Sequence, residues 1–196
     1  VYKSTDTHMV LDLDVASYYP NLAISNNLHP EHLGSTFSTI YNDLYQERKL
    51  YAKGSAENGI YKLALNGSYG NSNNKFSPFY DPRFTMAITL NGQLLLCMLS
   101  EALLTVDGLK IIQVNTDGVS SIFKRSDYDR VKSIYTDWEK LTGLVLEESN
   151  YSEMHIRDVN NYIAKFTDGS VKLKGAYDYN VDYHQNHSAL IVRKAV

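Results

Sequence analysis

Two carboxylates that lie far apart in the chain could together form a metal site. Asp14 ends the segment 8–14 (HMVLDLD), and Asp117 lies in the tetrapeptide 115–118 (NTDG) between two apolar runs. Mg²⁺ takes one or two carboxylates in proteins and completes its coordination with water and phosphate. Two such ions can stabilise the attacking and the leaving oxygen of a phosphoryl transfer. This chemistry requires a fold that brings Asp14 and Asp117 together.

Polar and cationic side chains between these carboxylates could bind phosphates. Lys62, Asn66 and Tyr69 are spaced i, i+4 and i+7, so they share one face of a helix expected over about 60–69. Three more cations lie near the end of a helix expected over about 39–53: Arg48, Lys49 and Lys53. Phosphoryl transfer depends on positioning and on neutralising charge. An antiparallel pair of these helices could aim the cations at one triphosphate.

Each of these residues also has an ordinary structural explanation when taken alone. Asp14 could be a turn or cap residue, and Lys62 could be a solvated surface lysine. Asp117 before Gly118 is a common hairpin turn pair. Their joint occurrence favours a single site. Asp12 lies two residues before Asp14 on the same strand face and could be an auxiliary acid, but we interpret it as structural.

The expected elements place the two carboxylates at one edge of a sheet. The order from residue 8 to residue 148 is β-α-β-β-α-β once two helices between residues 21 and 80 are set aside, which is the ferredoxin-like arrangement of an α+β fold. Strands are expected at 8–14, 109–114, 119–123 and 144–148, and helices at 81–106 and 127–141. A right-handed crossover makes the first two strands parallel, with the third antiparallel between them. The hairpin at 115–118 then lies where the first strand ends, so Asp14 and Asp117 should converge.

Composition excludes some function classes. The 22 acidic and 19 basic residues leave a net charge of −3, which excludes a strongly cationic field over the whole chain but leaves room for a local basic groove. The single cysteine, Cys97, excludes an intrachain disulfide and is expected in the core of the long helix. The longest apolar run, Leu94–Leu99, is far shorter than the ~20 residues of a membrane span. We therefore expect a cytoplasmic protein with no membrane partner.

Three short segments resemble, in order, the motifs of the B-family DNA polymerases. Residues 14–21 (DVASYYPN) resemble motif A, an Asp followed by Ser, Tyr and Pro at fixed offsets. Residues 62–70 (KLALNGSYG) resemble motif B, in which a Lys precedes an Asn by four residues and Tyr-Gly follows. Residues 115–118 resemble motif C, normally Asp-Thr-Asp-Ser. The similarity covers about residues 8–178.

The resemblance implies the catalytic core of a DNA-directed DNA polymerase of phage or mobile-element type. Such a core transfers a nucleotidyl group from a deoxynucleoside triphosphate to a primer 3′-OH with two Mg²⁺ ions, for which Mn²⁺ can substitute. The implied domains are a ferredoxin-like palm at 1–20 and 81–180, a two-helix fingers insertion at 21–80, and a stub at 181–196 that leads to a thumb. Implied partners are primer–template DNA and the exonuclease and thumb domains of a parent chain. The implied location is the bacterial host cytoplasm.

The resemblance also implies a role for each matching residue. The metal ligands would be Asp14, Asp117 and the backbone carbonyl of Val15. The nucleotide-binding residues would be Ser17, Tyr18, Tyr19, Arg48, Lys53, Lys62 and Asn66. The DNA-binding residues would be Tyr69, Gly70, Tyr162 and Lys174, the last two in a segment that contacts primer–template near the thumb. Asp14, Asp117 and Lys62 would be catalytic, and the Tyr19 ring would exclude a 2′-hydroxyl.

Departures from the motifs keep other readings open. Asn115 replaces the first Asp of motif C, Gly118 replaces its Ser, and Asn160 stands where a Lys usually precedes Tyr162. An amide adds no charge to a metal site, so the chain could instead be a catalytically silent palm-like module that binds nucleic acid or serves in assembly. A nucleotidyl cyclase or reverse transcriptase is disfavoured by the motif B segment 62–70.

Overall fold

The structure is a computed structural model in which residues 1–178 are described. The strands are β1 (Tyr2–Lys3), β2 (His8–Val15), β3 (Lys110–Val114), β4 (Gly118–Lys124), β5 (Leu146–Asp158), β6 (Asn161–Phe166) and β7 (Val171–Leu173). The helices are α1 (Tyr18–Ser25), α2 (Gly34–Arg48), α3 (Ala56–Gly70), α4 (Pro82–Leu103) and α5 (Tyr128–Thr142), with short 3₁₀ turns η1 (Arg125–Asp127) and η2 (Gly175–Tyr177). The predicted stub at 181–196 lies outside the described residues.

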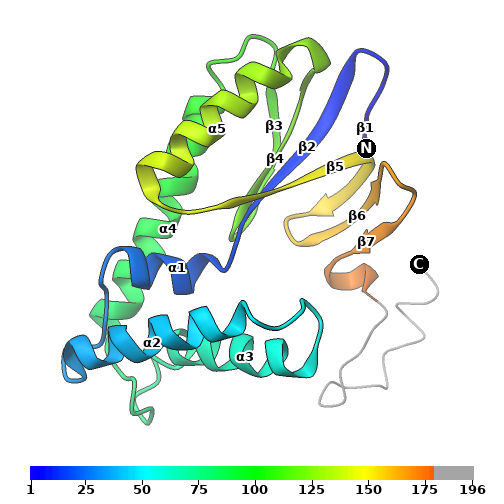
Figure 1. Ribbon diagram of the computed structural model, residues 1–196. Coiled ribbons are helices and arrows are strands. Elements are labelled where there is room, and N and C mark those ends of the chain that lie inside the picture. The colour runs from blue at the N-terminus through cyan, green and yellow to red at the C-terminus, as the bar shows by residue number, and fades with distance from the viewer. Residues whose placement is uncertain (179–196) are drawn as a thin grey trace. The chain divides into compact units, whose positions relative to one another are not determined.

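The strands form one sheet in the order β3-β4-β2-β5-β6-β7, with β1 added on β5 (Figure 1). β4 lies between β3 and β2 and is antiparallel to both. This is the strand arrangement that the sequence predicts, so the ferredoxin-like α+β fold is confirmed.

Contacts divide the chain into two compact units. Among the described residues, the first contains Val1–Asp14, Met98–Trp138 and 146–178; the second contains Val15–Cys97 and Glu139–Val145. The predicted division into palm and fingers is a separate division of the chain, and it remains a prediction.

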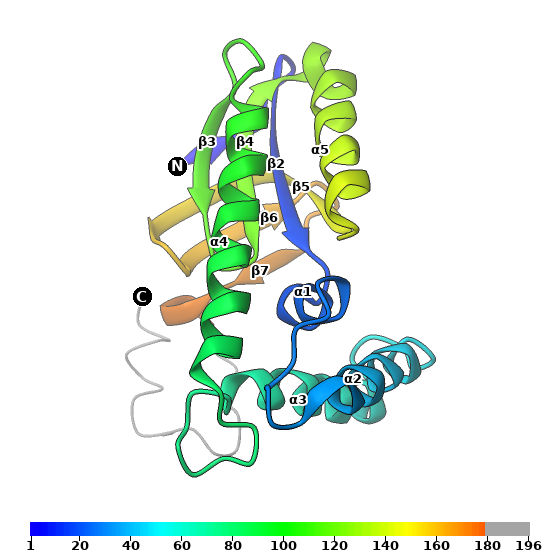
Figure 2. The same cartoon turned by 90° about the vertical axis from the view of Figure 1, so that its left-hand side faces the viewer.

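The first unit holds most of the sheet and one helical layer. Figures 1 and 2 show α5 and the C-terminal part of α4 on one face of β2, β3 and β4. The buried side chains of α5 recur at helical spacing: Val131, Tyr135 and Trp138. Side chains alternate along β2, so Leu11 and Leu13 share one face, and Val10, Asp12 and Asp14 share the other. Leu11, Leu13 and Val10 are fully buried, which shows that β2 is covered on both faces.

The second unit is built on helices α1, α2 and α3. A short connection joins α2 to α3, so the two helices run antiparallel, side by side. The Tyr41 hydroxyl of α2 donates a 2.7 Å hydrogen bond to the Leu65 carbonyl of α3. Ser55 caps α3 by accepting a hydrogen bond from the Asn58 N–H.

The structure corrects the predicted course of residues 18–53. Helix α1 was not predicted; Pro20 lies within its first turn, where a missing N–H costs no hydrogen bond. Helix α2 ends at Arg48, five residues before the predicted end, so Lys53 lies in the turn between α2 and α3 rather than on a helix.

Helix α4 buries only one of its faces. Its buried residues follow a repeat of three to four positions: Phe84, Ile88, Gly92, Leu96, Leu99 and Leu103. Cys97 is exposed, so its predicted place in the core is wrong. By length and composition alone α4 could cross a membrane, a test that core helices of soluble proteins also pass. Uninterrupted apolar runs do not identify α4 as a membrane candidate, because Asn91 and Gln93 interrupt its apolar residues.

Candidate active site

The ladder between β2 and β4 brings the two predicted carboxylates to one edge of the sheet. Asp14 is the direct antiparallel partner of Gly118, and Asp117 is the residue before it. The Asp117 carboxylate is close enough to contribute to the raised pKa of Asp14, after burial and the Asp12 carboxylate. The predicted convergence of the two segments is therefore confirmed.

Gly118 allows the Asp14 carboxylate to lie directly over the backbone of β4. A Cβ at position 118 would overlap Asp14 Oδ1 and lie 2.8 Å from the Leu13 carbonyl oxygen. The replacement of the motif serine by glycine thus has a local physical reason.

Asn115 closes the hairpin between β3 and β4. Its Oδ1 accepts a 3.1 Å hydrogen bond from the Asp117 N–H, and its own N–H donates to the Gly118 carbonyl at 3.0 Å. Asparagine forms such turns as readily as aspartate does. This contact gives Asn115 a structural role in placing Asp117.

Asp12 lies in a buried hydrogen-bonded network beside Asp14. It is 2% exposed, and its oxygens accept hydrogen bonds from Ser120 Oγ at 2.5 Å and from the Tyr151 hydroxyl at 2.8 Å. A buried carboxylate needs such partners to remain ionised. The interpretation of Asp12 as structural fits these contacts, although its negative charge also acts on Asp14.

Lys172 of β7 is the cation of this network, and the sequence analysis missed it. Its Nζ lies 3.2 Å from Asp14 Oδ2, 3.6 Å from Asp12 Oδ2 and 3.1 Å from the Tyr151 hydroxyl. Burial disfavours its charged form, but Asp14 and Tyr151 raise the pKa of Lys172 above its ordinary value. Burial and Asp12 likewise raise the pKa of the Tyr151 hydroxyl. Lys172 is therefore charged at neutral pH.

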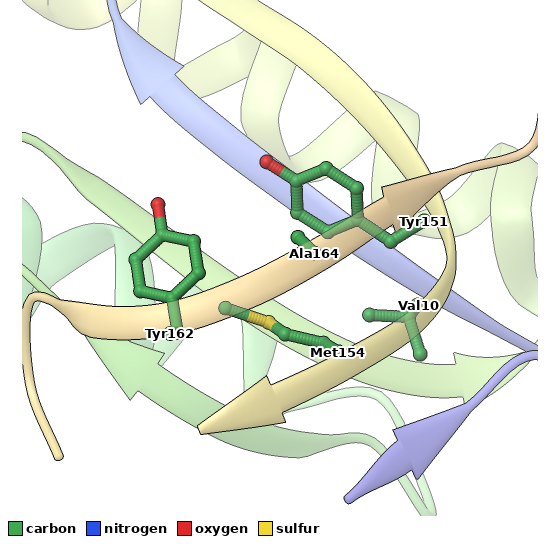
Figure 3. Close-up of a cluster of buried hydrophobic side chains, with 5 residues drawn as sticks. All are labelled: Val10, Tyr151, Met154, Tyr162 and Ala164. Carbon is green, nitrogen blue, oxygen red and sulfur yellow. The ribbon is translucent and has the colours of Figure 1, made fainter. Parts of the chain in front are cut away.

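Tyr162, predicted to contact DNA, belongs to a buried cluster with Tyr151. The cluster contains Val10, Tyr151, Met154, Tyr162 and Ala164 from β2, β5 and β6 (Figure 3). Figure 3 shows the hydroxyl groups of Tyr151 and Tyr162 pointing to the same side. Tyr162 is 1% exposed, so a DNA contact by this ring would require it to leave the cluster.

The predicted Lys174-Gly175 pair packs against the turn that precedes Tyr162. Gly175 has a φ of +61°, and a Cβ there would overlap the Asn160 carbonyl oxygen and Asn161 Oδ1. Asn161 Oδ1 accepts a 2.8 Å hydrogen bond from the Ala176 N–H. Lys174 itself is exposed, which leaves its ammonium group available to a ligand.

In the second unit, Ser17 and Arg48 form a candidate phosphate cradle. Ser17 precedes α1 with φ +48° and ψ +50°, a left-handed conformation that is uncommon outside glycine. Arg48 Nη1 donates a 2.9 Å hydrogen bond to Ser17 Oγ. The Asn58 side chain donates to the Arg48 and Tyr51 carbonyls, both at 3.2 Å, and so fixes the end of α2 that carries Arg48.

Three tyrosines of the second unit lie in one aromatic row. The Tyr19 ring stacks on Tyr69 with centroids 4.5 Å apart and on Tyr18 at 5.9 Å. The Tyr69 hydroxyl is hydrogen-bonded to Thr89 Oγ1 at 2.9 Å. The Tyr18 hydroxyl is buried and donates to the Gly92 carbonyl at 2.5 Å, so this side chain is packed inside the fold. The row holds the Tyr19 ring in a fixed position.

The other predicted residues of this unit lie on exposed parts of α3 and its flanking turn. Lys62 and Asn66 are exposed one turn apart on α3, as the i, i+4 spacing predicts. Gly70 is exposed at the end of α3, and Lys53 is exposed in the turn before it. Val15, the last residue of β2, is buried; its predicted metal ligand is the main-chain carbonyl oxygen, not the side chain.

A solved structure shares this fold over the whole chain. The family B DNA polymerase from the hyperthermophilic archaeon Pyrobaculum calidifontis superposes with a TM-score of 0.62 and 17% sequence identity. The chain therefore has the same fold as a segment of that polymerase. The match covers 100% of this chain and 32% of the polymerase, so the chain spans about a third of that protein's length. No protein-family model and no curated protein sequence matches the chain.

The sheet edge that carries Asp14 and Asp117 (the carboxylate edge) fits a metal ion that is bound together with a phosphate. Among residues 1–178, no group of three or more His, Cys, Asp or Glu side chains is placed to enclose a metal. Asp14 and Asp117 supply two hard carboxylates, and the Val15 carbonyl is a further oxygen in the chain. Mg²⁺ is commonly bound by one or two carboxylates together with substrate phosphates. The donor set therefore fits Mg²⁺ in a nucleotide complex better than a cage built by protein alone.

No sequence signal identifies Lys172 or Tyr151 as members of this edge. Lys172 stands 158 positions after Asp14, in a three-residue strand with no motif of its own. A lysine in such a strand is ordinarily a surface residue. Only the pairing of β6 with β7 brings its side chain to Asp14.

Proposed function

We propose that this chain is the catalytic core of a DNA-directed DNA polymerase that transfers nucleotidyl groups from deoxynucleoside triphosphates to a primer 3′-OH. The observation that carries the proposal is the pairing of Asp14 with Gly118, which joins the Asp14 and Asp117 carboxylates at one sheet edge. The polymerase fold of the neighbour, whose segment this chain matches throughout, supports the same reading.

The phosphate cradle begins three residues after Asp14 in the chain. Ser17 therefore lies within about 11 Å of Asp14 by covalent reach alone. Ser17 follows Asp14 closely in the chain, and Arg48 donates a hydrogen bond to Ser17. We therefore propose that the carboxylates and Arg48 bind the same substrate.

Each set of side chains has a distinct task in this reaction. Asp14 and Asp117 would hold Mg²⁺, which when bound supplies Lewis-acid stabilisation of the developing charge on the reacting oxygens. Arg48 and Lys62 would neutralise the β- and γ-phosphates, because phosphoryl transfer depends on neutralising charge. The hydrogen bonds from Arg48 to Ser17 and from Asn58 to the end of α2 hold the Arg48 guanidinium in place before substrate arrives.

Tyr19 would select the sugar. Its ring is held by the stack on Tyr69, and Tyr69 is held in turn by Thr89. A rigid ring under the sugar leaves no space for a 2′-hydroxyl, so deoxyribose would be preferred over ribose. Lys174 and the exposed end of α3 at Gly70 would contact primer–template DNA, and exonuclease and thumb domains of a parent chain would complete the grip on the duplex.

Primer extension with a labelled primer–template and all four deoxynucleoside triphosphates in Mn²⁺ tests the proposal. Weak template-directed extension is expected for the chain without a thumb, and Asp14→Asn or Asp117→Asn should each reduce it by about 10²–10³-fold, the scale of losing one main electrostatic group. Asp107→Asn, an exposed acidic residue after α4, is the matched control and should leave extension unchanged.

Two outcomes would contradict the proposal. Extension that survives both Asp14→Asn and Asp117→Asn would mean that another site or a contaminant performs it. DNA binding without extension, unaffected by either substitution and by Mn²⁺, would favour the catalytically silent nucleic-acid-binding module. The Asn115 amide, which adds no charge to the carboxylate edge, is the feature that favours that second candidate.

A further inference from the structure

The ammonium group of Lys172 is surrounded by three acceptors. A lysine carries three N–H donors and no acceptor. Its Nζ has the Tyr151 hydroxyl at 3.1 Å, Asp14 Oδ2 at 3.2 Å and Asp12 Oδ2 at 3.6 Å. The ammonium charge therefore lies between the two carboxylates of β2 and is neutralised by both.

Both carboxylate oxygens of Asp14 have close neighbours in this arrangement, and 31% of the side chain is exposed. Its Oδ2 accepts the hydrogen bond from Lys172, and its Oδ1 lies against the backbone at Gly118. A divalent cation that binds Asp14 through Oδ2 therefore competes with the Lys172 ammonium group for that oxygen.

Asp12 keeps Lys172 in the site after such a replacement. The Asp12 oxygens are fixed by Ser120 and Tyr151 and are almost inaccessible to solvent, so they cannot follow a metal outward. Lys172 would retain Asp12 and the Tyr151 hydroxyl when it loses Asp14. The exchange at Asp14 thus needs only a small movement of one flexible side chain.

We infer that Lys172 is an internal counter-cation that competes with the divalent metal for Asp14 and so ties metal binding to the arrival of the anionic triphosphate. Without the nucleotide, the metal must displace Lys172 at the expense of a charge-assisted hydrogen bond. With the nucleotide, the phosphates supply the negative charge that both cations require. This inference rests on the proposed metal site at Asp14 and Asp117.

Mn²⁺ binding in the absence of nucleotide and DNA tests the competition directly. Free Mn²⁺ is counted by electron paramagnetic resonance in titrations of the chain and its variants. Lys172→Met should tighten Mn²⁺ binding by on the order of tenfold, the equilibrium effect of one charge-assisted hydrogen bond. Lys172→Arg keeps the charge and should bind Mn²⁺ like the unaltered chain. Lys165→Met removes an exposed charge from the neighbouring strand β6 and is the matched control for general electrostatics.

A second titration, with a nonhydrolysable deoxynucleoside triphosphate present, completes the test. The difference between Lys172→Met and the unaltered chain should shrink, because the nucleotide supplies the missing negative charge. Circular dichroism establishes that each variant is folded, and Lys172→Gln, which keeps an N–H donor for Tyr151, replaces Lys172→Met if that variant unfolds.

The outcomes separate this inference from the proposed function. If Asp14→Asn removes Mn²⁺ binding but Lys172→Met leaves it unchanged or weaker, the metal site stands and the competition is wrong. If Lys165→Met tightens Mn²⁺ binding as much as Lys172→Met does, the effect is general electrostatics and the competition is again wrong. If Asp14→Asn has no effect on Mn²⁺ binding, the metal site itself is wrong, and the competition fails with it.

Discussion

Asp14 and Gly118 face each other directly in the ladder between β2 and β4, and Asp14 Oδ1 lies in the space that a side chain at position 118 would need. The pairing fixes the distance between two segments that are far apart in the chain. It also makes the orientation of the Asp14 carboxylate depend on the absence of a side chain at 118.

Gly118→Ala should therefore destabilise the protein and disturb the metal site. The added Cβ has to displace the Asp14 carboxylate or the backbone of β2, and overpacking of this kind costs about 1–3 kcal/mol. Thermal unfolding measures the loss, and Mn²⁺ titration measures the disturbance. Gly59→Ala is the control, because a Cβ there meets open space on α3 and helix propensity predicts a gain of up to about 1 kcal/mol. An unchanged melting temperature for Gly118→Ala would contradict the close contact with Asp14.

Arg48→Met should weaken binding of a deoxynucleoside triphosphate by about tenfold or more, because it removes one charge-assisted hydrogen bond to a phosphate. Isothermal titration of a nonhydrolysable analogue measures the dissociation constant. Lys49→Met removes the neighbouring charge, whose Nζ lies 4.4 Å from the Tyr45 ring centroid and donates to Gln46 instead. Equal losses for the two variants would show that general charge, and not the Arg48 position, attracts the nucleotide.

If the proposed function holds, Tyr19→Ala should raise ribonucleotide incorporation relative to deoxyribonucleotide incorporation by at least about tenfold, the scale of discrimination by pocket shape. The ratio of kcat/KM for the two sugars is the measurement. Tyr69→Phe keeps the ring stacked on Tyr19 and removes only the hydrogen bond to Thr89, so its effect should be small. Unchanged sugar discrimination in Tyr19→Ala would remove Tyr19 from this role.

Asp81→Ala should lower the free energy of unfolding by about 1 kcal/mol, the usual effect of losing a helix N-cap. Asp81 Oδ1 accepts hydrogen bonds from the N–H groups of Arg83 and Phe84, and Oδ2 accepts one from Glu31. The bond from Glu31 is the main cause of the lowered pKa of Asp81, followed by those at the start of α4. The contribution is therefore full above the ordinary pKa of 3.8 and is lost as the pH falls through the lowered value.

Chemical denaturation of the Asp81 variants at several pH values checks this prediction. The difference between the unaltered chain and Asp81→Ala should be constant near neutrality and should shrink in strong acid. Asp81→Asn keeps the acceptor geometry of the cap and should lose less stability than Asp81→Ala. A difference that grows on acidification would contradict the assigned sign.

The sheet topology and the meeting of Asp14 with Asp117 could be predicted because they depend on local signals. The apolar alternation of β2 and the short hairpin at Asn115 are visible in the sequence, and the handedness of crossovers supplies the rest. The end of α2 at Arg48 could not be predicted, because the residues that follow it continue the helical spacing of side chains.

The network around Asp14 could not be predicted because Tyr151 comes from a strand with register shifts and Lys172 from a strand of only three residues. The register of β5 against β6 shifts between Tyr151 and Glu153 and again between Ile156 and Asp158. Such bulges break the two-residue period from which strands are predicted. Lys172 reaches Asp14 through these irregular strands, so its role depends on long-range pairing that no local pattern encodes.

Anomalous scattering from a crystal grown with Mn²⁺ and a nonhydrolysable deoxynucleoside triphosphate tests the central claim most directly. We expect at least one Mn²⁺ peak bound by both Asp14 and Asp117 and by the triphosphate, and no such peak in Asp14→Asn. A structure in which the nucleotide binds but no Mn²⁺ contacts Asp14 or Asp117 would contradict a catalytic polymerase core.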